Sequence, residues 1–212
     1  MNEKYPITPD LIRAIIDQYT LTPNGIHGIA HWARVYDNGM SLANKTGADR
    51  QVVALFSVFH DACRINENSD PEHGIRGANL AKSFRGIHFE LPDEAFQSLH
   101  DACTHHTYSH THQDLSIRVC WDSDRLDLGR VGITPDPKYL CTEVAKSPSW
   151  IEQAYQQSIS GSHPDWISEK WGGMSPYPLN IGSRSETSRI FEQAPFLNVS
   201  EIKMSKIHSG DS

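Results

Sequence analysis

The stretch Val52-Val53-Ala54-Leu55-Phe56-Ser57-Val58-Phe59-His60-Asp61 decides the fold of this chain. Asp49 can cap a helix that runs from Arg50 to about Ala62. Because this helix is apolar on nearly all sides, we expect it to lie buried at the centre of a bundle. Polar groups at a buried helix end are costly unless they are paired. Imidazole nitrogen and carboxylate oxygen together suit a divalent metal, so His60-Asp61 indicates the centre of a metal site.

The segments on either side of this stretch also predict helices. Apolar spacing, capping residues and Gly or Pro breaks mark their limits. Helices are expected over residues 9–19, 26–42, 50–62, 71–85, 92–106 and 115–128, with short ones near 139–145 and 150–159. The last forty residues lack sustained periodicity and are expected to be loop or tail. The sequence therefore predicts an all-α helical bundle with a loop-rich C-terminal segment.

Length and composition limit the class of protein. The 212 residues suit one main domain, and the formal charge of −7 argues against a general nucleic-acid binder. No stretch is long and apolar enough for a membrane span, and the start has no apolar signal-peptide core, so a cytoplasmic location is expected. The four cysteines are widely spaced and are expected to be reduced core thiols. A thiol nucleophile at Cys63 or Cys103 stays an open alternative.

Histidine is the most informative residue type in the composition. The chain has twelve, and only two of them, His163 and His208, lie in the C-terminal third. His27 and His31 are four residues apart and are expected on one face of the helix over 26–42. His73 lies in the first turn of the helix over 71–85, and His105-His106 ends the helix over 92–106. Such a concentration favours a metal site, which a second ion could extend.

Three of these motifs together resemble the HD-domain superfamily of metal-dependent phosphohydrolases. They are His31 in Gly28-Ile29-Ala30-His31-Trp32-Ala33-Arg34-Val35, the pair His60-Asp61, and Asp124 in Asp122-Ser123-Asp124-Arg125-Leu126-Asp127. The stretch His73-Gly74-x-x-Gly77-Ala78 is also similar to that superfamily. The resemblance covers roughly residues 20–135. It implies an HD-type domain over residues 1–160, followed by a partly irregular C-terminal extension over residues 161–212.

The resemblance implies a set of metal ligands. Four residues would hold one divalent metal, namely His31, His60, Asp61 and Asp124. In the dinuclear branches of the superfamily extra histidines bind a second ion and the Asp of the pair bridges the two; the residues in question here are His27, His73, His105 and His106. In the mononuclear branch similar positions hold catalytic or substrate-binding side chains. The metal is Mn, Co, Ni, Fe, Zn or Mg, as one or two ions.

Catalytic roles are assigned to two histidines and two arginines. His73 or His105 would protonate the leaving oxygen, and Arg64 or Arg125 would bind phosphoryl oxygens with the guanidinium fork. Arg76 and Lys82 are second choices for the phosphate. Asp127 is similar to the residues that orient a ligand His from behind, and Arg34 is expected to brace the bundle.

The function that follows is hydrolysis of a phosphoester by metal-activated water. The expected partner is a small phosphorylated substrate, for which a nucleotide is one candidate, and neither a membrane nor an extended nucleic acid is expected. The oligomeric state is left open. Two alternatives remain: a diiron oxygenase that uses an HD-type ligand set, and a metal-containing binding or sensor module without turnover.

Overall fold

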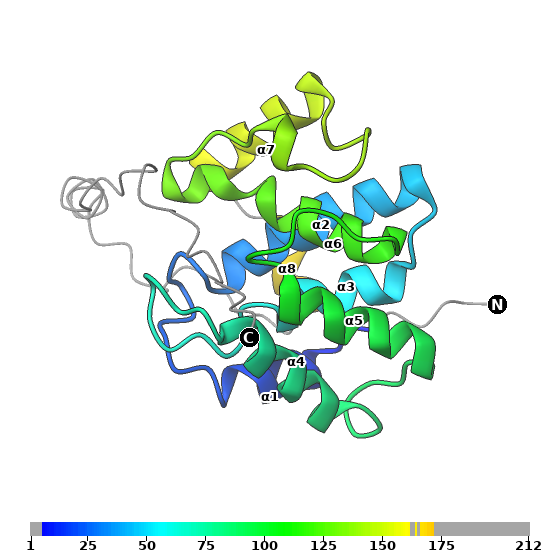
Figure 1. Cartoon of the computed structure of the whole chain (residues 1–212). Coiled ribbons are helices and arrows are strands. Elements are labelled where there is room, and N and C mark those ends of the chain that lie inside the picture. The colour runs from blue at the N-terminus through cyan, green and yellow to red at the C-terminus, as the bar shows by residue number, and fades with distance from the viewer. Residues whose placement is uncertain (1–5, 162–163, 165, 172–212) are drawn as a thin grey trace, which may run out of the picture. The chain divides into compact units, whose positions relative to one another are not determined.

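The central apolar stretch forms a buried helix, as predicted. The computed structural model describes residues 6–161, 164 and 166–171 (Figure 1). In it, α3 spans Arg50–Phe59, and the Asp49 carboxylate caps it by accepting hydrogen bonds from the amides of Gln51 and Val52 at 2.8 and 3.2 Å. Every residue from Val52 to Phe59 is buried. The helix therefore has no solvent face apart from its first turn.

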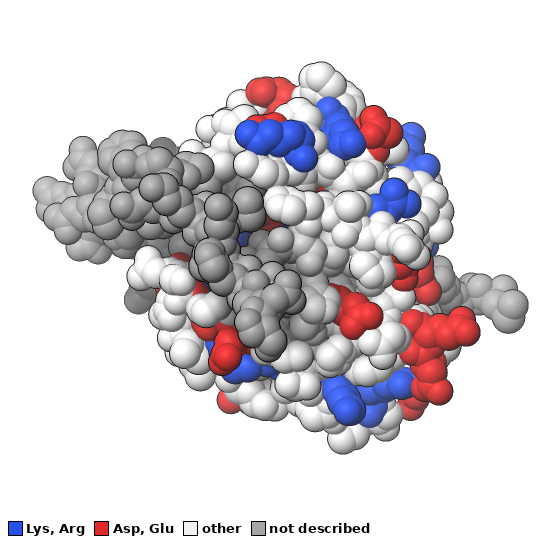
Figure 2. Space-filling view, in the orientation of Figure 1, with Lys and Arg blue, Asp and Glu red and all other residues white. Residues whose placement is uncertain are grey.

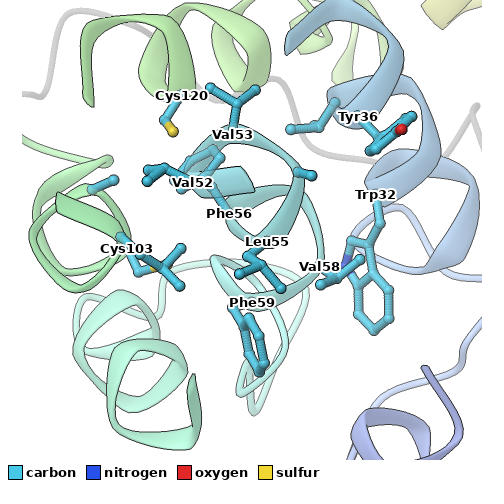
Figure 3. Packing of buried hydrophobic residues seen from close by; sticks show 14 of the residues in the cluster. Trp32, Tyr36, Val52, Val53, Leu55, Phe56, Val58, Phe59, Cys103 and Cys120 are labelled. Atoms are coloured by element: carbon cyan, nitrogen blue, oxygen red, sulfur yellow. The ribbon is translucent and has the colours of Figure 1, made fainter. Parts of the chain in front are cut away.

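Four helices surround α3. They are α2 (Ile29–Thr46), α4 (His73–Phe84), α5 (Asp93–His105) and α6 (Leu115–Arg125), and each contacts α3. Figure 3 shows the side chains of α3 radiating in all directions, towards Trp32 and Tyr36 of α2, Cys103 of α5 and Cys120 of α6. The predicted all-α bundle is confirmed. Because the four neighbours enclose α3, its C-terminal end carries His60 and Asp61 to a point where several helices meet.

The N-terminal helix, α1 (Pro9–Ile16), begins as its sequence predicts. Thr8 is the N-cap and accepts a hydrogen bond from the Leu11 amide at 3.2 Å, while Pro9 occupies the first helical position. Three apolar residues of the helix are fully buried in the core, namely Leu11, Ile12 and Ile15. The helix ends at Ile16, three residues earlier than expected.

The start of α2 differs from the prediction in a way that affects the site. The helix begins at Ile29 rather than near Ile26. The Ile29 amide donates to the carbonyl of Pro23 at 2.8 Å, and a Cβ on Gly28 would lie 2.0 Å from that same carbonyl oxygen. This close approach needs glycine and sets the turn that precedes the helix. His27 therefore lies in the turn and not on the helix.

The chain after α6 packs on the bundle through shorter elements. These are the 3-10 helices η1 (Leu128–Val131) and η2 (Pro137–Tyr139), then α7 (Pro148–Ile159) and the single turn α8 (Ile167–Lys170). The helix expected near residues 139–145 is replaced by η2 and turns. The buried Asp122 carboxylate explains this, because it accepts hydrogen bonds from the backbone amides of Cys141 and Thr142 at 2.5 and 2.8 Å.

Part of the expected C-terminal extension belongs to the core. Trp171 is fully buried, and Trp166 donates a hydrogen bond to Asp37 of α2 at 3.0 Å. The ring of Tyr36 lies 5.0 Å from that of Trp166 and 6.4 Å from that of Trp171. The boundary proposed at residue 161 thus falls before an element that packs on α2. The remainder of the extension, 172–212, lies outside the described residues.

The face seen in Figure 2 carries charges of both signs. Acidic and basic side chains are scattered among uncharged residues there, and some of them adjoin at the lower right. Within the described ranges, no helix combines the length and apolar character needed to cross a bilayer.

Gly77 of α4 allows the backbone of that helix to touch the end of α3. A Cβ at this position would lie 2.2 Å from the carbonyl oxygen of Phe59 and 3.2 Å from that of His60. We expect Gly77→Ala to lower the free energy of unfolding by about 1–3 kcal/mol, because the clash is with backbone that cannot move aside. Urea unfolding measures this. Asn79→Ala, exposed on the same helix, is the control and should cost nothing; equal midpoints for the two variants would contradict the packing argument.

Candidate metal centre

Residues from three helices meet beyond the end of α3. His60 is the C-cap of α3 and Asp61 follows it, while His31 comes from α2 and Asp124 from α6. His31, His60 and Asp124 each offer a ligand atom within 4.8 Å of the others, so they form a group that could hold a metal. The Asp61 Oδ2 atom lies 3.5 Å from His31 Nε2 and 3.7 Å from His60 Nε2. The four predicted ligands of the first metal are thus brought together.

The facing histidine nitrogens of this first group could hold a cation between them. His31 Nδ1 lies 2.7 Å from Asp127 Oδ2, and His60 Nδ1 lies 3.1 Å from the carbonyl oxygen of Phe56. Since both oxygens are acceptors, each Nδ1 carries the proton and each Nε2 presents a lone pair. Yet the two Nε2 atoms are only 3.0 Å apart. Two lone pairs at this distance repel unless a metal ion or a proton lies between them.

A second group on the other side of Asp61 repeats this arrangement. It consists of Asp61, His73 and His106. His73 Nδ1 donates to the carbonyl of Asp70, and His106 Nδ1 donates to that of Cys103 at 2.7 Å. Their Nε2 atoms again face each other, at 2.8 Å. This second pair could therefore also hold a cation, and the Arg64 Nη1 atom lies 3.3 Å from His73 Nε2.

Asp61 joins the two groups. Its Oδ2 faces the first group, whereas its Oδ1 lies 3.1 Å from His73 Nε2 and 3.8 Å from His106 Nε2. Burial alone would raise the pKa of this carboxyl group, but the adjacent His60 and hydrogen bonds from surrounding histidines hold the pKa well below its usual range. The carboxylate is therefore ionised and presents one oxygen to each group.

The donor set fits divalent metal ions. Imidazole nitrogens and carboxylate oxygens suit Mn, Fe, Co, Ni and Zn. Burial lowers the pKa of His60 to about 3 and lowers that of His106, so both imidazoles are neutral near pH 7, as ligands must be. Asp124 contributes a second ionised carboxylate, because although burial would raise its pKa, neighbouring charges bring it below its usual range.

Asp127 orients His31 from behind, as expected. It is buried after the end of α6, and its Oδ2 holds the Nδ1–H of His31. Arg34 of α2 donates to both oxygens of the same carboxylate, at 2.6 and 3.1 Å. The expected bracing role of Arg34 thus acts through Asp127. A carboxylate that fixes the tautomer of a ligand histidine is a common second layer of metal sites.

Two arginines lie beside the groups. Arg64 Nη1 is 3.4 Å from Asp61 Oδ1 and 3.3 Å from His73 Nε2, which places this predicted residue next to the second group. Arg130 of η1 lies beside the first group, with Nη2 at 3.7 Å from Asp124 Oδ1. Its other nitrogens are fixed by the carbonyls of Ile26 and Asp127. Each group therefore has one guanidinium at its edge.

Comparison with known proteins bears on the fold. The chain matches no family model and shows no significant similarity to a curated protein. Among solved structures, it is similar to the crystal structure of a predicted HD superfamily hydrolase from an uncultured Thermotogales bacterium. The TM-score is 0.57 and the identity 20%, over 75% of this chain and 91% of that one. This chain has the HD fold. The resemblance found in the sequence is thereby confirmed for the fold, and the chemistry must be argued from the residues.

Two residues that the sequence predicted for the site lie elsewhere. His105 is exposed and belongs to neither group, whereas its neighbour His106 is buried in the second group. Arg125 points away, because it donates hydrogen bonds to the carbonyls of Tyr139, His106 and Ser109. It holds the loop after α5 against η2. The second choices also differ, since Arg76 is paired with Asp70 and Lys82 is exposed.

His27 reaches the centre from the turn before α2. Its Nδ1 lies 2.8 Å from Asp61 Oδ2, and its Nε2 lies 3.8 Å from Glu67 Oε2. His27, His31 and Asp61 form another group that could hold a metal. However, Asp61 already engages the Nδ1 of His27 as an acceptor. The arrangement therefore makes His27 a hydrogen-bond donor to the shared carboxylate.

Sequence reasoning missed Arg130, and it named both His105 and His106 as ligand candidates but gave the catalytic role to His105, although signals for Arg130 and for the buried histidine exist. The buried face of α5 follows helical spacing through Leu99, Ala102, Cys103 and His106, and His105 lies outside that face. Arg130 stands three residues after Asp127, one turn further along the chain. No residue pattern predicts that Glu67 belongs to the site, because the position of its carboxylate depends on the turn around Gly25.

Among the described residues, two cysteines and two surface hollows show no comparable chemistry. Burial raises the pKa of Cys63 and Cys103, which disfavours the reactive thiolate that the alternative nucleophile requires. Two surface hollows of about 450 and 710 Å³ lie near Ile87 and His88 and include none of the residues of the metal groups.

Asp127→Asn tests the orientation of His31. The amide can turn its NH2 group towards His31 and so favour the tautomer whose Nε2 carries a proton and cannot bind metal. We expect metal affinity to fall about 10–100-fold, measured by competition with a chromophoric chelator. Asp101→Asn on the outside of α5 is the matched control. Unchanged affinity in the Asp127 variant, with the fold verified by circular dichroism, would show that this carboxylate does not orient a ligand.

The metal-stripped protein should lose stability as the pH falls. Burial lowers the pKa of His27, His60 and His106 from an ordinary value of 6.5. Below that pH the unfolded chain binds more protons than the folded chain, so the free energy of unfolding decreases as the pH falls. Each histidine contributes up to about 1.4 kcal/mol per pH unit. Urea unfolding with chelator at about pH 7.5 and 5.5 measures the change, and identical midpoints would contradict it.

Proposed function

We propose that this protein is a metal-dependent phosphohydrolase that cleaves a phosphoester at a centre of two divalent ions. The observation that carries this proposal is the Asp61 carboxylate, which presents one oxygen to each of two groups with facing histidine Nε2 atoms. Paired divalent ions held in this way can stabilise both the attacking and the leaving oxygen of an in-line displacement.

The charge around the centre supports an anionic substrate. Four carboxylates face three guanidinium groups, so the protein part alone has an excess of negative charge. These residues are Asp61, Asp124, Asp127 and Glu67, and Arg34, Arg64 and Arg130. Two divalent ions would reverse the sign and leave positive charge for a phosphate dianion and the attacking water. Phosphate binding is therefore expected to require metal.

The two edge arginines are placed to hold the phosphoryl group. Arg64 Nη2 is anchored by the carbonyl of Asn68 at 2.7 Å, which leaves Nη1 directed at the second group. Arg130 Nη2 is directed at the first group, where it lies 3.7 Å from Asp124 Oδ1. A guanidinium on either side would bind the non-bridging oxygens as their charge increases. Arg130 takes the role that sequence analysis gave to Arg125.

The reaction needs activation of water and neutralisation of charge on phosphorus, which bound divalent ions supply. The residues of the chain fix the geometry of the site. His31, His60, His73 and His106 are locked by their Nδ1 hydrogen bonds, and Asp127 and Arg34 prevent His31 from turning. Water oxygen bonds to phosphorus, the ester P–O bond breaks, and the net change moves one proton from water to the leaving oxygen. Because both nitrogens of His73 are engaged, we assign it as a ligand rather than the proton donor.

One observation also favours a second candidate. The shared carboxylate and the histidine-rich groups are equally suited to a pair of iron ions, as in the oxygenase alternative. Oxygen consumption by the iron-loaded protein, together with a mixed-valent iron signal, would support that function over hydrolysis. The phosphohydrolase is preferred because two guanidiniums border the centre. Nucleotides are one substrate class among the phosphoesters to test.

The proposed function is tested with Mn-loaded protein and a panel of nucleotides, cyclic nucleotides and simple alkyl and aryl phosphates. We expect the wild type to release phosphate or alcohol from at least one class. Asp61→Ala should reduce turnover to background, because it removes a ligand oxygen from both groups. Binding of inorganic phosphate, measured by calorimetry, should appear only in the metal-loaded wild type.

Further variants separate this function from its alternatives. Arg130→Gln should raise KM about ten-fold or more, since it removes a charged contact to phosphate, while Arg13→Gln, on the exposed face of α1, should not. Turnover retained in Asp61→Ala would contradict the mechanism. Tight binding of a phosphoester without turnover would instead support the binding-module alternative.

A further inference from the structure

Three polar atoms on the His27 side of the centre have no hydrogen-bond partner within the described part of the chain. Glu67 Oε2 and the Tyr19 hydroxyl are buried and unpaired. Tyr19 as a whole is only 9% exposed. The third atom, His27 Nε2, lies 3.8 Å from Glu67 Oε2, too far for a hydrogen bond. Buried polar groups without partners are unusual in a folded protein and call for a physical explanation.

The acceptors of this set cannot satisfy each other. His27 Nδ1 lies 2.8 Å from Asp61 Oδ2, so it carries the proton and Nε2 presents a lone pair. Glu67 Oε2 is also an acceptor when the carboxylate is ionised. Burial raises the pKa of Glu67, with Asp61 adding to the rise and Arg64 opposing it. Two acceptors directed at the same space require a donor, and none of the described residues donates a hydrogen bond to Glu67 Oε2 or to His27 Nε2.

The position of these atoms is set by packing between the turn before α2 and the segment after α3. Thr20 donates a hydrogen bond to the carbonyl of Arg64 at 2.7 Å, which joins the two segments. A Cβ on Gly25 would lie 2.3 Å from Glu67 Oε1, so the turn closes directly on this carboxylate. The ring of Tyr19 is held edge-on to that of Trp32, with centroids 5.2 Å apart.

The tyrosine shares the electrostatic environment of Glu67. Burial raises the pKa of the Tyr19 hydroxyl, and the charges of Glu67 and Asp61 raise it further. The hydroxyl therefore stays protonated and can both donate and accept a hydrogen bond. Because His27 contacts Asp61 directly, His27 Nε2 and Glu67 Oε2 adjoin the centre that would hold phosphate, and the charges of Glu67 and Asp61 act on the Tyr19 hydroxyl.

We propose that His27 Nε2, Glu67 Oε2 and the Tyr19 hydroxyl form a leaving-group subsite, which binds a hydrogen-bond donor carried close to the phosphate of the substrate. This inference rests on the proposed function, since the metal groups would hold the phosphate. The donor is a hydroxyl, which could donate to one of the two acceptors and accept from the Tyr19 hydroxyl, or an ammonium group, which could donate to both acceptors. The subsite therefore selects small polar phosphoesters over purely apolar ones.

Matched ligands test the subsite by binding alone. Ethylphosphonate, 2-hydroxyethylphosphonate and 2-aminoethylphosphonate differ only in the donor, and calorimetry on the Mn-loaded protein measures Kd for each. We expect at least one donor-bearing ligand to bind about 10–100-fold more tightly than ethylphosphonate, as one or two buried hydrogen bonds predict. The hydroxyl and amino arms identify which donor the subsite prefers.

Variants show whether the preference comes from these residues. Glu67→Gln and Tyr19→Phe should each reduce several-fold the ratio of Kd for ethylphosphonate to Kd for the donor-bearing ligand; a purely structural role would weaken all three ligands alike and leave this ratio unchanged. Gly25→Ala should have the same selective effect, because its Cβ displaces the carboxylate without removing it. Glu72→Gln, exposed on the surface, is the matched control and should change nothing.

The outcomes separate this inference from the proposed function. Equal Kd values for the three ligands in the wild type would overturn the subsite and leave the phosphate centre intact, with water then filling the gap. A preference that persists in both the Glu67 and Tyr19 variants would also overturn the assignment to these residues. If metal-loaded protein binds none of the three ligands and turns over no ethyl phosphate, the phosphate centre itself fails, and the subsite with it.

Discussion

The ionised carboxylate of Asp61 is the constraint on which the rest of this structure depends. It is 2% exposed and stands at the end of a helix that has no solvent face beyond its first turn. A charge in such a place must be surrounded by donors or cations. The chain supplies His27, Arg64 and two pairs of histidines. Each of the four paired imidazoles is turned by an Nδ1 hydrogen bond so that its Nε2 faces its partner. The packing of α2, α4, α5 and α6 around α3 brings these groups close to the Asp61 carboxylate.

Much of this could be predicted from the sequence, because the relevant signals are local and repetitive. The buried stretch before His60 has no polar face, so only a central position suits it, and Asp49 and Thr8 marked helix starts that the structure confirms. His31, His60, Asp61 and Asp124 are the residues whose roles depend on regular helices, and the structure brings them together. The HD fold follows from the same motifs and agrees with the solved structure to which the chain is similar.

What could not be predicted depends on turns and on contacts between distant segments. His27 was expected on a helix, but the Pro23 carbonyl captures the Ile29 amide and keeps His27 in the preceding turn. Neither Arg125 nor Arg130 has a sequence signal that favours it over the other as a residue of the site. The loop after α5 binds Arg125, whereas η1 directs Arg130 towards the centre. Choosing between His105 and His106 required the exact phase of α5, for which Leu99 and Cys103 were available as markers. Glu67 has no helix to place it at all.

The first group also affects the stability of the folded protein. Its ligands come from α2, from the end of α3 and from α6, which are widely separated along the chain. An ion bound there would act as a cross-link that closes two long loops at once, and such a link removes freedom mainly from the unfolded chain. Binding of the ion would also raise the free energy of unfolding by mass action, and this stabilisation would increase with the metal concentration. Since His31, His60 and Asp61 are buried and Asp124 is only partly exposed, the ion would leave mainly when the helices part. Metal loss would then be slow and would occur at a rate set by opening of the bundle.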